Sequence, residues 1–227
     1  QVVESLMINL FKKFSSKKIL HEKFPRITFK ESMLKYGTDK PDLRNPLLIQ
    51  EITSIFSRED VKFEIFKKLV KKGALVRTIV VKNTKDKPRS FFDNIDKWAK
   101  DQGSSGLAYF SLEQEKKLSG KGPIGKFFSE DSLKELAKIC NASAGDSFFL
   151  ACGKEDEIEK ILSLARTKIA EDLQLIDKDK FAFCWIVDYP MFELDKNTNK
   201  IKFSHNPFSL PQGKIENINF DDPPKIK

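Results

Sequence analysis

The chain has 227 residues, 40% of them hydrophobic and 20 of them phenylalanine, and carries a formal net charge of +8. Such a chain holds one large domain, or one domain with incomplete flanks, around an apolar core. It contains no run of about 18 apolar residues, and its first residues lack the basic and apolar regions of a signal peptide, so neither a membrane nor export is indicated.

The first 50 residues are expected to contain a structured segment, followed by a connector that ends near residue 50. Apolar residues recur every three or four positions between residues 3 and 14, which predicts an amphipathic helix. Residues 24–29 are expected to be extended. Pro41 and Pro46 then bias the residues before them away from helix, which is typical of a connector.

Residues 51–172 are predicted to form one compact α+β unit. Four strands are expected, at residues 61–65, 74–81, 106–112 and 147–152. Three helices are expected: one capped by Ser90 and ended by Gly103, one capped by Ser129, and one whose inner side runs from Ile158 to Ile169. Strands that alternate with helices imply helices packed on a mixed β-sheet.

The hydrophobic pattern of the sequence changes after Asp177. Residues 181–187 are continuously apolar, as in a strand buried on both faces. Residues 197–199 are expected to turn a hairpin into a strand at 200–203. The predicted domain organisation is therefore 1–50, 51–172 and 173–227.

The three cysteines, Cys140, Cys152 and Cys184, form no CxxC pair, and the chain has only two histidines. We therefore predict no metal site, and expect the cysteines to be small buried hydrophobes in a reducing cytoplasm.

The positive charge raises the question of a nucleic-acid surface, because lysine and arginine that neutralise phosphates give sequence-independent affinity. Most lysines occur as scattered pairs among acidic neighbours, and only residues 67–72 form a dense basic cluster. Charge alone therefore favours a solvated surface and leaves a nucleic-acid patch open.

Residues 120–126 satisfy the GxxxxGK pattern of a phosphate-binding loop. Phe127 stands where a hydroxyl must coordinate Mg²⁺, and Pro123 removes an N–H donor. We predict a surface turn here. A phosphate-loop NTPase remains the alternative, and it would require nucleotide binding that is lost on Lys126→Ala.

Two short stretches carry the most specific signal. Residues 36–44 read Tyr-Gly-Thr-Asp-Lys-Pro-Asp-Leu-Arg, and residues 185–193 read Trp-Ile-Val-Asp-Tyr-Pro-Met-Phe-Glu, followed by Ser-His-Asn-Pro-Phe at 204–208. In this order, with an α/β module between them, they resemble the middle of a bacterial-type aspartyl-tRNA synthetase, a class II enzyme. The resemblance implies that residues 51–172 are the insertion (GAD) domain and that the flanks are incomplete parts of an antiparallel catalytic sheet.

In this family the enzyme activates aspartate with ATP and Mg²⁺ and transfers it to the 3′ end of tRNA(Asp); whether tRNA(Asn) is also charged stays open. The second and third class II motifs, which would hold ATP and Mg²⁺, are not found in this chain. The resemblance therefore implies a segment, inactive alone, of a cytoplasmic, homodimeric ligase. The alternative is a stand-alone tRNA-binding or protein-interaction module, because related insertion domains occur in tRNA-dependent amidotransferases.

The resemblance also assigns one substrate contact. His205 aligns with the first histidine of a His-His-Pro-Phe-like motif that helps recognise the substrate aspartate, a task for which an imidazole donor is suited. On sequence alone, a histidine beside a proline is more often a surface or packing residue. Asn206 replaces the second histidine, and an amide carries no charge, which puts the electrostatic help of that position in doubt.

Asp188 ends the predicted strand at 181–187. It is either a neighbour of the substrate site or a cap of the turn at Pro190. Asp39, Asp42 and Arg44 are expected to form a hydrogen-bonded or ion-paired hinge, and no catalytic residue is assigned.

Overall fold

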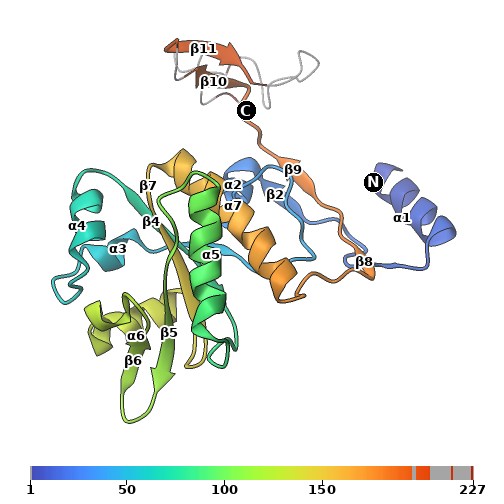
Figure 1. Cartoon of the computed structure of the whole chain (residues 1–227). Helices are drawn as coiled ribbons and strands as arrows, with labels where there is room; N and C mark the ends of the chain where they lie inside the picture. The colour runs from blue at the N-terminus through green and yellow to red at the C-terminus, as the bar shows by residue number, and fades with distance from the viewer. Residues whose placement is uncertain (1, 196–197, 205–215, 217–225, 227) are drawn as a thin grey trace.

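The computed structural model describes residues 2–195, 198–204, 216 and 226 (Figure 1). Its helices are α1 Val2–Phe14, α2 Phe29–Tyr36, α3 Thr53–Phe56, α4 Glu64–Lys71, α5 Arg89–Asp101, the 3₁₀ helix η1 Gly125–Phe127, α6 Glu130–Ile139 and α7 Glu155–Asp172. Its strands are β1 Lys18–Ile19, β2 Arg26–Thr28, β3 Ile49–Glu51, β4 Leu75–Val81, β5 Ala108–Gln114, β6 Leu118–Lys121, β7 Ser147–Gly153, β8 Lys180–Phe181, β9 Trp185–Val187, β10 Phe192–Asp195 and β11 Lys200–Phe203. Among the described residues, no helix combines the length and apolar character needed to cross a membrane.

The central unit is a five-stranded sheet in the order β3-β4-β7-β5-β6. Every pairing in it is antiparallel. The expected α+β class is confirmed, but the expectation of a mixed sheet is wrong. Helix α5 connects β4 to β5, which run in the same direction, yet β7 inserts between them and is antiparallel to both. The two parallel strands of this split β-α-β unit therefore never pair.

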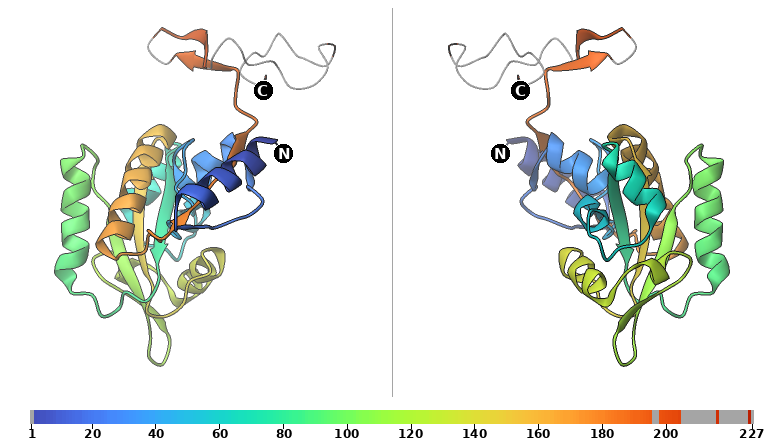
Figure 2. Two further views of the ribbon diagram at one scale, coloured as in Figure 1. Left: turned by 90° about the vertical axis from the view of Figure 1, so that its right-hand side faces the viewer. Right: turned by 90° about the vertical axis from the view of Figure 1, so that its left-hand side faces the viewer.

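Helices cover both faces of the sheet (Figure 2). Helices α5 and α7 pack on one face, and α3, α4 and α6 pack on the other. Strand β7 serves both cores, because its side chains alternate: Phe149 and Ala151 lie in the first cluster, and Phe148 and Leu150 in the second. This alternation inside one buried strand explains its continuous apolar sequence.

Several predicted details are confirmed. Ser129 caps α6 by accepting a hydrogen bond from Ser132 N at 3.0 Å. Gly103, at φ +83°, follows the end of α5. The buried positions of α7 include every apolar residue predicted for its inner side. Strands β10 and β11 form the expected hairpin.

Two predicted details of the central unit are wrong. Residues 61–65 do not form a strand: α4 begins at Glu64, and Ile65 is 64% exposed while Phe63 and Phe66 pack on the core. Helix α5 is not capped by Ser90, because it begins at Arg89 with Pro88 at the cap position. Proline is tolerated there because it needs no helical N–H partner.

The predicted strand at 181–187 is broken into β8 and β9, and its residues are half-buried. Both strands pair with the other flank, β8 with β1 and β9 with β2, and both pairs are parallel. The flanks were expected to be parts of an antiparallel sheet, and among the pairs of their described residues only β10–β11 is antiparallel. Parallel pairing is possible because the whole central unit forms the crossover between the partners.

Candidate functional site

The second signature stretch lies beside the segment that precedes the first one, although the two are far apart in sequence (Figure 1). Strand β9 pairs with β2, with Val187 opposite Thr28. Thr28 caps α2 by accepting a hydrogen bond from Glu31 N at 3.1 Å, so β9 ends beside the start of this helix. The rings of Phe29 and Tyr189 lie 5.1 Å apart at this contact between the end of β9 and the start of α2, which we call the junction.

Tyr189 reaches from the second signature stretch to the first. Its hydroxyl lies 3.4 Å from both the carbonyl oxygen and Oδ2 of Asp39. Burial raises the pKa of Tyr189, so the phenol keeps its proton and serves as the donor in this contact. Lys40 Nζ lies 2.9 Å from the same Asp39 carboxylate.

Of the three residues expected to form the hinge, Asp42 and Arg44 form an ion pair with each other, whereas Asp39 contacts Lys40 and Tyr189. Arg44 Nε and Nη2 donate to the two carboxylate oxygens at 2.9 and 2.8 Å, and Arg44 N adds a third bond at 3.0 Å. These donors hold the pKa of the Asp42 carboxyl below its usual range. The hinge therefore has a fixed local shape.

Arg166 joins this hinge to the central unit. It lies on the buried side of α7, is 2% exposed, and its guanidinium carbon lies 4.9 Å from the Tyr36 ring centre. Its side chain donates to the carbonyl oxygens of Leu47, Asp42 and Asn45 at 2.5, 2.8 and 2.8 Å. Burial lowers the pKa of this guanidinium, and the three carbonyls and the Tyr36 ring take the place of water around it. Our sequence analysis missed this residue; the available signal was an arginine within the apolar inner side of a helix.

Asp188 lies directly after β9 at φ +58° and is half-buried. Aspartate is one of the few residues that adopt this left-handed conformation readily, so its position fits the turn before Pro190. Its predicted place near the substrate site stays a prediction.

His205 and Asn206 lie outside the described residues. Ser204, the last described residue before them, donates from its main-chain N to Met191 O at 2.9 Å and from its hydroxyl to Pro190 O. The chain therefore approaches position 205 beside the turn that follows Asp188.

A cavity of about 390 Å³ opens near the junction, lined by His21, Glu31, Tyr36 and Asn45 among others. Within the described part of the chain, no group of histidine, cysteine, aspartate and glutamate side chains has the arrangement of a metal site.

The chain matches one domain family and several curated proteins. The GAD domain family matches residues 66–162. The chain is 67% identical over all 227 residues to an aspartate–tRNA(Asp/Asn) ligase of Pelagibacter ubique. It is 47% identical over 225 residues to the enzyme of that name from Ehrlichia canis, and 44% over 224 residues to that from Gluconobacter oxydans.

These alignments cover 98–100% of this chain and 37–38% of each relative. The chain thus spans a little over a third of the length of the curated relatives it matches, which agrees with the expected segment. The central part of the chain is therefore similar to the GAD domain family, and the resemblance to aspartate–tRNA ligases extends along the whole chain.

Proposed function

We propose that this chain is part of an aspartate–tRNA ligase that charges both tRNA(Asp) and tRNA(Asn). In the first step the aspartate carboxylate attacks the α-phosphorus of ATP and displaces pyrophosphate. In the second step the terminal ribose hydroxyl of the tRNA attacks the aspartyl adenylate and displaces AMP. The observation that carries this proposal is the 67% identity over all 227 residues to a ligase with this pair of tRNAs in its name.

The proposal assigns residues 1–50 and 173–227 to one catalytic domain and residues 51–172 to the domain inserted in it. The pairing of β2 with β9 supports this division, because it joins the two flanks across the insertion. The Asp42–Arg44 pair and Arg166 then fix the insertion at its exit from the catalytic domain. Holding this connecting segment in a fixed position would help to position the reacting groups, on which catalysis depends.

His205 is proposed to donate a hydrogen bond to the side-chain carboxylate of the substrate aspartate. Asn206 and Asp188 are proposed neighbours of that site. The approach of Ser204 to the turn after Asp188 supports grouping them. None of the described residues is assigned to ATP or Mg²⁺, and the parent enzyme is proposed to be a cytoplasmic homodimer.

Aminoacylation with aspartate, ATP, Mg²⁺ and each tRNA tests the proposal. The full-length protein should be active with both tRNAs, and the 227-residue chain should be inactive. His205→Ala in the full-length protein should raise KM for aspartate, because the lost contact is to the substrate. His21→Ala is the matched control, since His21 is exposed and is the other histidine of the chain.

Two results would contradict the proposal. No aminoacylation by the full-length protein, together with tRNA binding, would favour the alternative of a stand-alone tRNA-binding module. An unchanged KM for aspartate in His205→Ala would remove the proposed contact and leave the ligase activity standing.

A further inference from the structure

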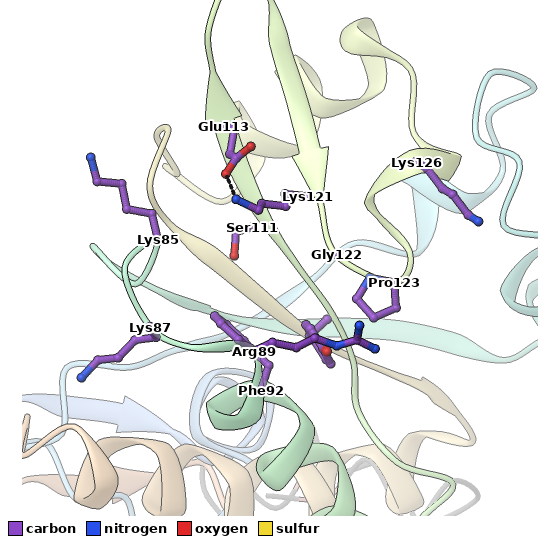
Figure 3. Close-up of a pocket in the computed structure, with 11 residues that line it drawn as sticks. Lys85, Lys87, Arg89, Phe92, Ser111, Glu113, Lys121, Gly122, Pro123 and Lys126 are labelled. Atoms are coloured by element: carbon purple, nitrogen blue, oxygen red, sulfur yellow. Dashed lines mark hydrogen bonds and ion pairs between the residues drawn. The ribbon is translucent and has the colours of Figure 1, made fainter.

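A basic pocket of about 610 Å³ lies on the face of the sheet that carries α5 (Figure 3). Five basic side chains line it: Lys85, Lys87, Arg89, Lys121 and Lys126. Glu113 is the acidic residue of the lining. Phe92 and Tyr109, whose rings stack 5.1 Å apart, form an apolar part of the lining. We refer to this site as the basic pocket.

Only part of this positive charge is neutralised. Lys121 pairs with Glu113 at 2.8 Å, and Arg89 pairs with Asp93 at 3.3 Å. Lys85, Lys87 and Lys126 are exposed, and none of the carboxylates in the described residues forms an ion pair with them. Exposed lysines without acidic partners attract anions, and a concave wall focuses their field.

Two structural elements bring these residues together. Lys87 and Arg89 flank the N-terminus of α5, which has no side-chain cap and no acidic residue in its first turn. The helix dipole therefore adds to the positive potential at the pocket. Lys121 and Lys126 come from the GxxxxGK segment across the pocket, so this segment contributes two cations to the lining.

The glycines of that segment have a structural explanation. A Cβ on Gly120 would lie 2.8 Å from Gly125 Cα, and a Cβ on Gly125 would lie 2.4 Å from Gly120 C. Glycine is needed because the loop folds back on itself.

The cations are spread around the rim. Lys85 and Lys87 extend to one side of the pocket, and Lys126 extends to the other (Figure 3). A single phosphate would need donors that converge on one point, whereas a phosphodiester chain presents charges along its length. The spread therefore favours an extended polyanion.

We propose that the basic pocket binds the phosphate backbone of tRNA. The proposal rests on the proposed function, which supplies the RNA partner, and names the surface of the GAD domain that meets it. The dense basic cluster noted in the sequence, residues 67–72, lies on and just after α4 on the opposite face of the sheet and is not part of this surface.

The test measures tRNA binding by the full-length protein in the absence of aspartate and ATP, at several salt concentrations. The pocket variant is Lys85→Gln/Lys87→Gln/Lys126→Gln. The control variant, Lys68→Gln/Lys71→Gln/Lys72→Gln, removes the same charge from exposed positions on the α4 side. Lys67 is left intact because its Nζ donates to the main-chain oxygens of Arg58 and Val61.

The pocket variant is expected to bind tRNA about tenfold more weakly, and its slope of log Kd against log salt should fall by about two, because each lost phosphate contact removes about 0.7–0.9. The control should bind like the unmodified protein. If both variants bind tRNA equally weakly, the effect comes from net charge and not from the pocket. If the pocket variant binds tRNA as tightly as the unmodified protein, the pocket is not a tRNA site. Either result overturns the proposal.

A second measurement needs no variant. Bound tRNA should protect Lys85, Lys87 and Lys126 from acetylation while Lys68, Lys71 and Lys72 stay reactive, and the reverse pattern contradicts the proposal. Protection of the pocket lysines by ATP or inorganic phosphate but not by tRNA would make the basic pocket a small-phosphate site and overturn the RNA assignment.

Aminoacylation measured alongside separates the two proposals. A full-length protein that does not aminoacylate, but loses tRNA binding in the pocket variant, would keep the basic pocket and lose the ligase. An active ligase whose pocket variant binds tRNA normally would keep the ligase and lose the basic pocket.

Discussion

Asn45 and Arg166 are joined by two hydrogen bonds, and each residue donates one of them. The Asn45 side chain donates from Nδ2 to the Arg166 carbonyl oxygen at 2.9 Å, and Arg166 Nη2 donates to the Asn45 carbonyl oxygen at 2.8 Å. Both residues are at most 3% exposed. Because buried polar groups without partners are costly, this reciprocal pair ties α7 of the central unit to the connector after the first signature stretch.

Arg166→Ala is expected to lower the free energy of unfolding of the 227-residue chain by about 3 kcal/mol, since two buried carbonyls and a partly buried one lose their donor. Urea unfolding followed by circular dichroism measures the change. Thr167→Ala, at the exposed next position of α7, should stay within about 0.5 kcal/mol of the unmodified chain. Similar stability for the two variants would show that the connector relaxes around the missing side chain.

Gly37 belongs to the first signature stretch and lies close to α7. It ends α2 at φ +68°, and a Cβ there would lie 2.7 Å from the Glu159 carbonyl oxygen. Gly37→Ala should destabilise the chain by about 3 kcal/mol, of which about 1–2 comes from the left-handed backbone and the rest from the clash.

Gly73→Ala separates these two causes. Gly73 has φ +91° with nothing within 4 Å of an added Cβ, so only the backbone cost of about 1–2 kcal/mol applies. Equal losses for both substitutions in urea unfolding would refute the close approach of α2 to α7.

The sequence predicted those elements whose pattern is set within the element itself. Helix α7 and strands β4 and β7 follow from local periodicity, and Ser129 was recognised as a cap from its neighbours. The strand predicted at residues 61–65 was wrong because it, too, was predicted from a local pattern alone. Val61, Phe63 and Phe66 all face the same core, and the alternation that suggested a strand ignored the helical spacing of Phe63, Phe66 and Val70.

Relationships between distant segments could not be predicted in this way. The insertion of β7 between β4 and β5 depends on which strands become neighbours, and no local pattern specifies that choice. The contacts of Arg166 likewise join residues more than 100 positions apart. The assignment of His205 came from resemblance alone and stays a prediction.

Acid should weaken the contact between the residues after α3 and helix α6. Arg58 donates to both oxygens of Asp60 at 2.8 and 2.9 Å, and the Ser129 hydroxyl donates to the same carboxylate. These donors hold the pKa of Asp60 well below its usual range. A carboxyl with a depressed folded-state pKa contributes stability above its unfolded value of about 3.9, and this contribution is lost as the pH falls through the folded value.

Asp60→Asn should therefore remove more stability at pH 7 than near pH 2, because part of the contribution is already lost once the pH falls below the unfolded-state pKa. The effect should stay below about 1 kcal/mol, because the Asp60 side chain is 34% exposed and solvent screens it. Asp131→Asn, an exposed carboxylate in the first turn of α6, is the control. An equal loss for Asp60→Asn at pH 2 and pH 7 would show that its role is packing rather than charge.

Cys140 should be slowed more than Cys152 in its reaction with an alkylating reagent, because burial raises its pKa further. Burial raises the pKa of the Cys140 thiol to about 12 and that of Cys152 to about 11. Because the thiolate is the reactive form, Cys140 at pH 8 should alkylate about a thousandfold more slowly in the folded chain than in urea. Cys152 should be slowed about a hundredfold by the same argument. Mass spectrometry of peptides after timed iodoacetamide pulses gives each rate separately, and Cys140 labelling as fast in the folded chain as in urea would mean that α6 opens from the sheet on the timescale of the pulse.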